Sequence, residues 1–333
     1  MNTDAFLVAL RGVAADRQGR LGFRGAPPKA VEEVLIAPGA PEGLPDGTVL
    51  VAPEIGDARG VPIGDAALAH PDGLLAAMLR ALKPRRVQAV GPGRPKLRKL
   101  AVFVPESHLE AVRSAVAAAG AGRIGNYAEC TFITHGEGAF RPLAGSSPFL
   151  GREGELERVA EARLEVVYSP CREAGILAAM RAAHPYEEIA YDVLELAVED
   201  PEYGALWLGA CDGEAVEGVA EKVGAAAGSN AIYACAGEAP RAARRVAVCA
   251  GPEAVAAATG LDLDALIADV VPDAAADRLH NRGTWLFEVR DLEACARRHL
   301  AELLRSALPV DVRLSPGGWR WQKYPTAGDR GRS

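Results

Sequence analysis

The chain has 333 residues, of which 49% are apolar and 24% are charged. This length predicts two or three domains, and the composition excludes a disordered chain because it supplies enough apolar surface for real cores. The formal net charge is -7, whereas a protein that neutralises many phosphates needs an excess of positive charge. Broad nucleic-acid binding is therefore not expected.

The sequence also argues against a membrane protein or a secreted one. No apolar run reaches the roughly 18 residues that span a bilayer. The first residues, MNTDAFLVALRG, carry an apolar patch without the basic region of a signal peptide before it. The 6 cysteines are widely spaced and form no CxxC pair, which argues against a disulfide framework or a zinc ribbon. We therefore expect a cytoplasmic protein with reduced thiols.

The first segment, residues 1–96, alternates short strand-like and helix-like runs. Residues 31–37, 48–52 and 85–91 are compact β-rich runs and predict strands. Residues 74–82 predict a helix that opens after Pro71-Asp72-Gly73. Residues 91–99 are rich in Pro, Gly and basic side chains, which is typical of a linker.

The middle segment, residues 97–197, predicts two β-α-β units in succession. The arrangement is ferredoxin-like, with both helices on one face of an antiparallel sheet. The expected strands are residues 100–104, 130–135, 163–168 and 189–196, and the expected helices are residues 106–119 and 171–183.

The last segment, residues 198–333, alternates strands with helices and predicts an α/β layer sandwich. Asp291 is a suitable N-cap for the longest helix, and Trp319 and Trp321 are expected on one face of a short strand. The expected strands are residues 206–211, 230–236, 244–251, 264–271 and 284–289, and the helices are 215–227, 274–283, 291–308 and one that begins at residue 252.

The densest polar cluster is His184-Pro185-Tyr186-Glu187-Glu188. A histidine and two carboxylates are residue types that bind metal ions or move protons. However, Pro185 ends a helix before it, and a strand would direct Glu187 and Glu188 to opposite faces. The favoured alternative is a turn that leads into a strand.

Two further runs have the composition of anion sites. The run Gly122–Tyr127 (GRIGNY) is a glycine turn whose backbone N–H groups could bind an anion. It lacks GxGxxG spacing, and a loop before the strand at Cys130 is the favoured alternative. A basic run contains no acidic residue and no interleaved aromatic residue, so a solvated linker is favoured over a phosphate site. Its members are Lys83, Arg85, Arg86, Arg94, Lys96, Arg98 and Lys99.

Two sets of residues have the spacing of metal ligands. Asp291, Cys295 and His299 follow one another at i, i+4 and i+8 and would share a helix face. We favour the alternative that they bind no metal and only lie at the edge of the helix face that carries the leucines. His70 and Asp72 place a histidine and a carboxylate just before a helix, and the favoured alternative is that Asp72 is a cap and nothing more.

Several motifs in the middle segment carry a family resemblance: VFVPE, GRIGNYAECTF, FRPL and HPYEEIAYD. This segment resembles the CutA/PII-like insert of three-domain Nif-three-like (YqfO-like) proteins, the homologs of GTP cyclohydrolase I type 2. The last segment is similar to their second metal-binding lobe through YGALWLGAC, RRVAVCAG, DALIADVV and HLAELL, in that order. The first segment matches least.

The resemblance implies an α/β fold in which a discontinuous, layered Nif-three-like domain is interrupted by a ferredoxin-like α+β insert. The domain would comprise residues 1–96 and 198–333, and the insert residues 97–197. The resemblance also implies a toroidal homo-hexamer with two divalent metal ions between the lobes.

The usual ligands in that family are a His-His pair, a His-Thr-x-x-Asp motif, and a C-terminal His closely followed by Glu. This sequence has no His-His pair, and His70-Pro71-Asp72 is only distantly similar to the second motif. Arg290 and Glu293 stand where the C-terminal His and Glu are expected. The sequence therefore predicts a degenerate metal site and assigns no metal ligand, cofactor or catalytic residue.

Two hypotheses about function follow. The first is an oligomeric ligand-binding or regulatory homolog, whose insert binds a small molecule or a nucleotide. The candidate ligand-binding residues are Asn126, Tyr127, His184, Tyr186, Glu187 and Glu188. The alternative is a metal-dependent hydrolase with rebuilt ligands, which would be drawn from His70, Asp72, His280 and Glu293.

Overall fold

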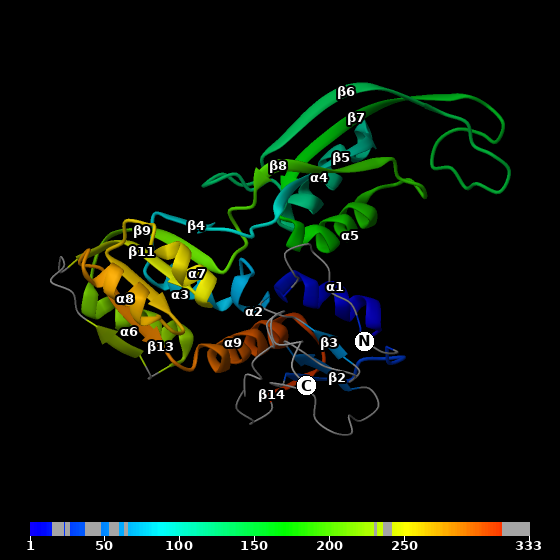
Figure 1. Ribbon diagram of the computed structural model, residues 1–333. Coiled ribbons are helices and arrows are strands. Elements are labelled where there is room, and N and C mark those ends of the chain that lie inside the picture. The colour runs from blue at the N-terminus through cyan, green and yellow to red at the C-terminus, as the bar shows by residue number, and fades with distance from the viewer. Residues whose placement is uncertain are drawn as a thin grey trace, which may run out of the picture.

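The computed structural model describes residues 1–14, 23, 27–36, 48–52, 60–62, 66–229, 232–235 and 242–314. Over these residues the chain forms three sheets, two of four strands and one of six (Figure 1). The predicted strand around Trp319 and Trp321 lies outside the described residues, as do residues 37, 230, 231 and 236 of two other predicted strands. None of the described helices is long and apolar enough to cross a membrane.

The first sheet joins the two ends of the chain. Its strand order is β14-β1-β2-β3 and all its pairings are parallel, with bounds β1 Glu33–Ile36, β2 Thr48–Ala52, β3 Gly60–Pro62 and β14 Asp311–Leu314. Helices α1 (Thr3–Ala14) and α9 (Leu292–Ala307) contact each other, and Phe6 and Leu10 share a core with Leu300 and Leu304. The first and last segments therefore form one body, as the predicted discontinuous domain requires.

The second sheet is the centre of an α/β sandwich. Its strand order is β10-β13-β12-β11-β9-β4, in which β11, β12 and β13 are parallel. Alternate residues of β11 face opposite cores, because Val246 and Val248 pack in one and Ala247 and Cys249 in the other. The strands are β4 Arg86–Val90, β9 Leu206–Ala215, β10 Ile232–Cys235, β11 Ala242–Cys249, β12 Ala265–Ala268 and β13 Trp285–Val289.

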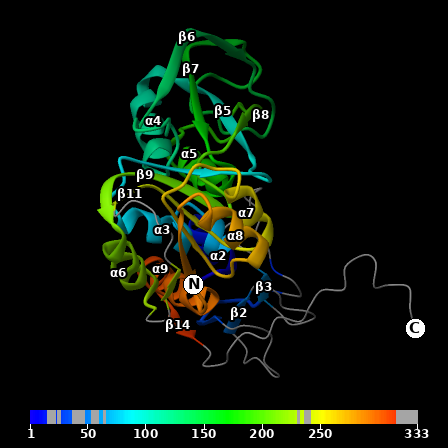
Figure 2. The ribbon, with the colours of Figure 1, turned by 60° about the vertical axis from the view of Figure 1, so that its left-hand side comes forward.

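Helices cover both faces of this sheet (Figure 2). On one face the core contains leucines of α3 (Leu74–Ala81) and valines of α6 (Val216–Ala227), and the short helix α2 (Ala66–Ala69) contacts α3. On the other face lie α7 (Pro252–Ala258) and α8 (Asp273–His280). The layered α/β domain that the sequence predicts is thus confirmed.

The third sheet is antiparallel and has the order β6-β7-β5-β8. Two helices pack on one face, where Val112, Val116, Ile176 and Met180 meet alternate apolar residues of the strands. This confirms the ferredoxin-like insert. The elements are β5 Lys96–Pro105, α4 Leu109–Ala118, β6 Thr131–Phe140, β7 Glu157–Tyr168, α5 Glu173–Ala183 and β8 Tyr191–Glu199, with single turns η1 Glu106–His108 and η2 Pro170–Arg172 before the helices.

Two predictions about the middle segment need correction. Residues 96–99 are not linker but the start of β5. Strands β6 and β7 are also longer than predicted, because they continue as a two-stranded arm beyond the rest of the sheet (Figure 1). Most side chains of the arm are exposed or only partly buried, so no apolar alternation marks this part of either strand in the sequence.

Candidate functional site

The His184 side chain is held by the protein itself. His184 ends α5 in an extended conformation, as Pro185 requires of the residue before it. Its Nε2 lies 2.9 Å from the Phe103 carbonyl oxygen and donates to it, while Nδ1 accepts from the Tyr186 N–H at 3.1 Å. Burial lowers the pKa of the imidazole, which favours the neutral form. Both ring nitrogens are thus occupied, so neither is free to bind a metal.

Residues 141–156 connect β6 to β7, and we call this segment the strap. The next residues of the motif, Tyr186 and Glu187, contact it. The Tyr186 hydroxyl donates to Glu161 at 3.0 Å, and burial raises its pKa to about 12. The Tyr186 ring lies 6.2 Å from that of Phe149 in the strap. Glu187 accepts a hydrogen bond from the Ser147 N–H at 2.8 Å. The motif therefore positions the strap over the end of α5.

Replacing Glu187 with Ala is expected to loosen the strap without unfolding the insert. The bond to Ser147 is charge-assisted but exposed, so we expect about fivefold faster hydrogen exchange at the Ser147 amide. Glu188 is exposed beside it, and Glu188→Ala is the matched control. Equal exchange in both variants would show that the Phe149 contacts alone hold the strap.

Asn126 and Tyr127 lie at the opposite end of the insert. Their loop is tied to the end of β7, because the Gly122 N–H donates to the Val167 carbonyl at 2.8 Å. Glu161, beside Tyr186, is six residues earlier on β7, or about 20 Å away along the strand. Asn126 is exposed and the Tyr127 side chain is 75% exposed. The candidate ligand-binding residues therefore form two separate groups.

His70 and Asp72 lie where the insert meets the layered domain. The His70 ring is fully buried, and burial lowers its pKa to about 3. Its Nδ1 accepts from the Asp72 N–H at 3.1 Å, while Nε2 has no hydrogen-bond partner. The Asp72 carboxylate pairs with Arg172 at 3.3 Å and does not cap α3, whose N-cap is Gly73. The expectation that Asp72 is a cap was wrong.

These residues do not fit a pair of divalent metal ions. Because Nδ1 of His70 accepts a hydrogen bond, Nε2 carries the proton and offers a metal no lone pair. Burial and the charges of Arg172 and Arg80 disfavour a positive charge here, and only the Asp72 charge favours one. His280 is exposed on α8, and Glu293 lies on α9. Within the described residues, no three His, Cys, Asp or Glu side chains are grouped so as to hold a metal.

The predicted ligand set on α9, Asp291, Cys295 and His299, contacts other groups of the protein. Asp291 occupies the N-cap position, but its carboxylate accepts from the Ser229 hydroxyl at 2.5 Å. The Arg298 guanidinium lies 3.0 Å from the Cys295 sulfur and 3.5 Å from Asp291. The His299 ring contacts the Asp72 carbonyl at 2.9 Å. Two of these residues thus contact a cationic side chain, and the third contacts a backbone carbonyl.

A buried polar network at the same junction was not predicted. Asp200 is fully buried, and its carboxylate accepts from the Ser169 hydroxyl and from the Glu202 N–H. Its own N–H donates to the Pro95 carbonyl at 2.8 Å. This bond joins the segment by which the chain enters the insert to the segment by which it leaves. Ser169 and Asp200 are 31 residues apart, so no local pattern could have revealed the pair.

Comparisons with known proteins agree with the fold. No protein-family model matches the chain. It is 48% identical over 108 residues to a Bacillus subtilis protein named GTP cyclohydrolase 1 type 2 homolog, which is 32% of this chain and 29% of that protein. A Mycobacterium leprae protein of the same name is 39% identical over 192 residues, covering 57% of this chain and 48% of the relative. The chain thus matches less than half the length of these relatives.

A solved structure extends the likeness of fold to nearly the whole chain. The crystal structure of a Bacillus cereus protein related to NIF3 covers 95% of this chain and 96% of its own, with a TM-score of 0.59 at 23% identity. These matches agree with the resemblance that the sequence motifs indicate: the chain has the fold of a NIF3-related protein and, over part of its length, is similar in sequence to proteins named GTP cyclohydrolase 1 type 2 homolog.

Proposed function

We propose that this protein is an oligomeric ligand-binding homolog whose dinuclear metal site is degenerate. The observation that carries the proposal is the state of the expected ligands at the junction. Asp72 pairs with Arg172, and His299 contacts the Asp72 backbone, so these groups are engaged by the protein itself. A cation entering there would have to break the partly buried ion pair between Asp72 and Arg172 and would meet the positive charge of Arg172.

The ligand-binding role rests on the end of the insert that carries the strap. The Phe149 ring is 48% exposed and lies between His108, at 5.4 Å, and Tyr186. Glu187 and Glu188 are exposed beside it. Aromatic faces with carboxylates at their border suit a flat heterocycle that carries N–H donors, such as a nucleotide base. A small molecule or nucleotide of this kind is the ligand we propose.

Oligomer formation is supported by the edges of the third sheet. Strands β6 and β8 are its edge strands, and both expose large apolar side chains. Phe132 on β6 is 68% exposed, and Leu194 and Val198 on β8 are 46% and 59% exposed. Exposed apolar edges readily pair with another chain. We propose that they contact copies of the same protein in a hexamer.

The proposed location is the cytoplasm. Four of the cysteines whose side chains the structure describes are free and buried, namely Cys171, Cys211, Cys249 and Cys295. Unpaired thiols are typical of a reducing compartment.

The test is elemental analysis of protein purified without chelator, together with native mass spectrometry. We expect a hexamer with well under one metal ion per chain. About two tightly bound ions per chain, lost in the variant His70→Ala, would overturn the degenerate site and favour the metal-dependent hydrolase. A monomer in the native mass spectrum would overturn the proposed hexamer.

A further inference from the structure

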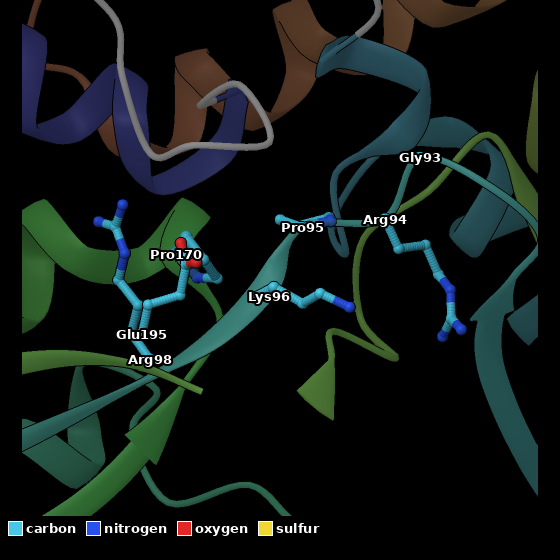
Figure 3. Close-up of a pocket in the computed structure, with 7 residues that line it drawn as sticks. All are labelled: Gly93, Arg94, Pro95, Lys96, Arg98, Pro170 and Glu195. Atoms are coloured by element: carbon cyan, nitrogen blue, oxygen red, sulfur yellow. The ribbon is translucent and has the colours of Figure 1, made fainter. Parts of the chain in front are cut away.

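A hollow of about 270 Å³ opens where the chain crosses from β4 into β5 (Figure 3). Three cations line it, Arg94, Lys96 and Arg98, against one carboxylate, Glu195. Pro95 and Pro170 form stiff parts of its wall. The hollow is separate from the strap, and the basic run that lines it was the part of the sequence with the composition of a phosphate site.

Two of the cations are fixed in place by the protein. The Arg94 guanidinium donates to the Ala89 and Gly91 carbonyls at 3.0 and 3.3 Å and also pairs with Glu199. Arg98 pairs with Glu173 at 2.7 Å, and that carboxylate also accepts from the Tyr168 hydroxyl. These contacts hold both charges at the wall, so little conformational entropy is lost when a ligand binds.

The third cation is held loosely. Lys96 Nζ lies 3.6 Å from Glu199, whose carboxylate is already engaged by Arg94. The Lys96 side chain is 41% exposed. One carboxylate thus serves two cations, and the Lys96 ammonium can turn into the hollow without leaving a buried charge unpaired.

Glu195 restricts what the hollow can accept. It faces Arg98 directly across the β5–β8 pair, so their Cα atoms lie about 5 Å apart. A bare anion on Lys96 and Arg98 would be repelled by this carboxylate. A ligand that carries both an anion and a hydrogen-bond donor a few ångströms away would satisfy both sides. A sugar phosphate has this pattern, because hydroxyl groups lie close to the phosphate.

We propose that the hollow binds a small phosphate ester of a sugar. The Lys96 ammonium and the Arg98 guanidinium donate to the phosphate oxygens, and Glu195 accepts from a sugar hydroxyl. Two prolines of the wall lie in or beside the segments that join the insert to the layered domain: the Pro95 carbonyl accepts from the Asp200 N–H, and Pro170 begins η2. A ligand in the hollow therefore contacts these joining segments. This site is additional to the ligand proposed at the strap and does not depend on it.

Calorimetric titration of the full chain tests the proposal, with ribose 5-phosphate, inorganic phosphate and ribose as probes. We expect ribose 5-phosphate to bind more tightly than either of the others. Lys96→Gln should weaken it about tenfold, since one charge-assisted hydrogen bond is lost. The matched control is Lys99→Gln, on the same strand but paired with Glu165 outside the hollow, which should leave binding unchanged.

Glu195→Gln separates the two halves of the site. Removing its charge should strengthen inorganic phosphate binding severalfold and shrink the advantage of the ester. Equal affinity for phosphate and ester in the unmodified protein would overturn the assignment of a sugar ester. No binding of any probe, or equal weakening by Lys96→Gln and Lys99→Gln, would overturn the site itself.

Discussion

Replacing Gly122 with Ala is expected to lower the free energy of unfolding of the insert by about 3 kcal/mol. Gly122 has φ +75°, and a Cβ there would lie 2.8 Å from the Cys130 carbonyl oxygen and 2.9 Å from the Cys130 nitrogen. Both are backbone atoms, so no side chain can move aside. The clash would also disturb the hydrogen bond from the Cys130 N–H to the Gly122 carbonyl, 2.8 Å long, just before β6.

The matched control is Gly125→Ala in the same loop. Gly125 also has a positive φ, +59°, but nothing lies within 4 Å of its Cβ position. Gly125→Ala should therefore lower the free energy of unfolding by only about 1 kcal/mol, the cost of a left-handed conformation for alanine. A protein of two domains need not unfold in a single transition. The measurement is therefore hydrogen exchange of the β6 amides, which reports on the insert alone. Equal losses in the two variants would contradict the steric account.

Where local pattern and fold agree, the sequence predicts the elements well. The apolar spacing of Ile176 and Met180 gives α5, and both side chains are buried in the insert core. The first helix, α1, and the last described strand, β14, were not predicted. Strand β14 has four residues and is defined by its parallel pairing with β1, almost a whole chain length away. No local window contains that information.

The candidate site shows the same limit in its side chains. Pro185 correctly predicts that α5 ends at His184, because proline constrains its predecessor locally. The partners of the motif come from elsewhere: Phe103 for His184 and Ser147 for Glu187. The residue types alone therefore suggest a metal or proton-transfer site, whereas the hydrogen-bond partners show that the motif holds the strap in position. The role of these residues in ligand binding stays a prediction.

The second large effect concerns Asp200, whose burial should make folding depend on pH. Burial raises the pKa of the Asp200 carboxyl from its usual 3.8 to about 6, even though Ser169 and the Glu202 N–H donate to it. The Glu202 charge acts in the same direction as burial, while the Arg172 charge opposes both. The nearby Cys171 thiol is not ionised in this range, because burial raises its pKa to about 12.

The sign follows from proton binding. Between about pH 4 and pH 6 the folded state holds the Asp200 proton and the unfolded state has lost it. This carboxyl therefore contributes stability that is lost as the pH rises through that window, by about 3 kcal/mol in all. Above pH 6 the folded state contains a buried carboxylate that two hydrogen bonds offset only in part.

Asp200→Asn should remove this dependence, because the amide keeps an acceptor for the Glu202 N–H but does not titrate. Urea unfolding at pH 4.5 and 7.5 should give a smaller drop in stability for Asp200→Asn than for the unmodified protein, by about 2 kcal/mol. Asp192→Asn is the control, since Asp192 is exposed on β8 and should leave the difference unchanged. The same drop in all three proteins would mean that the hydrogen bonds from Ser169 and Glu202 fully offset burial, and that this junction does not sense pH.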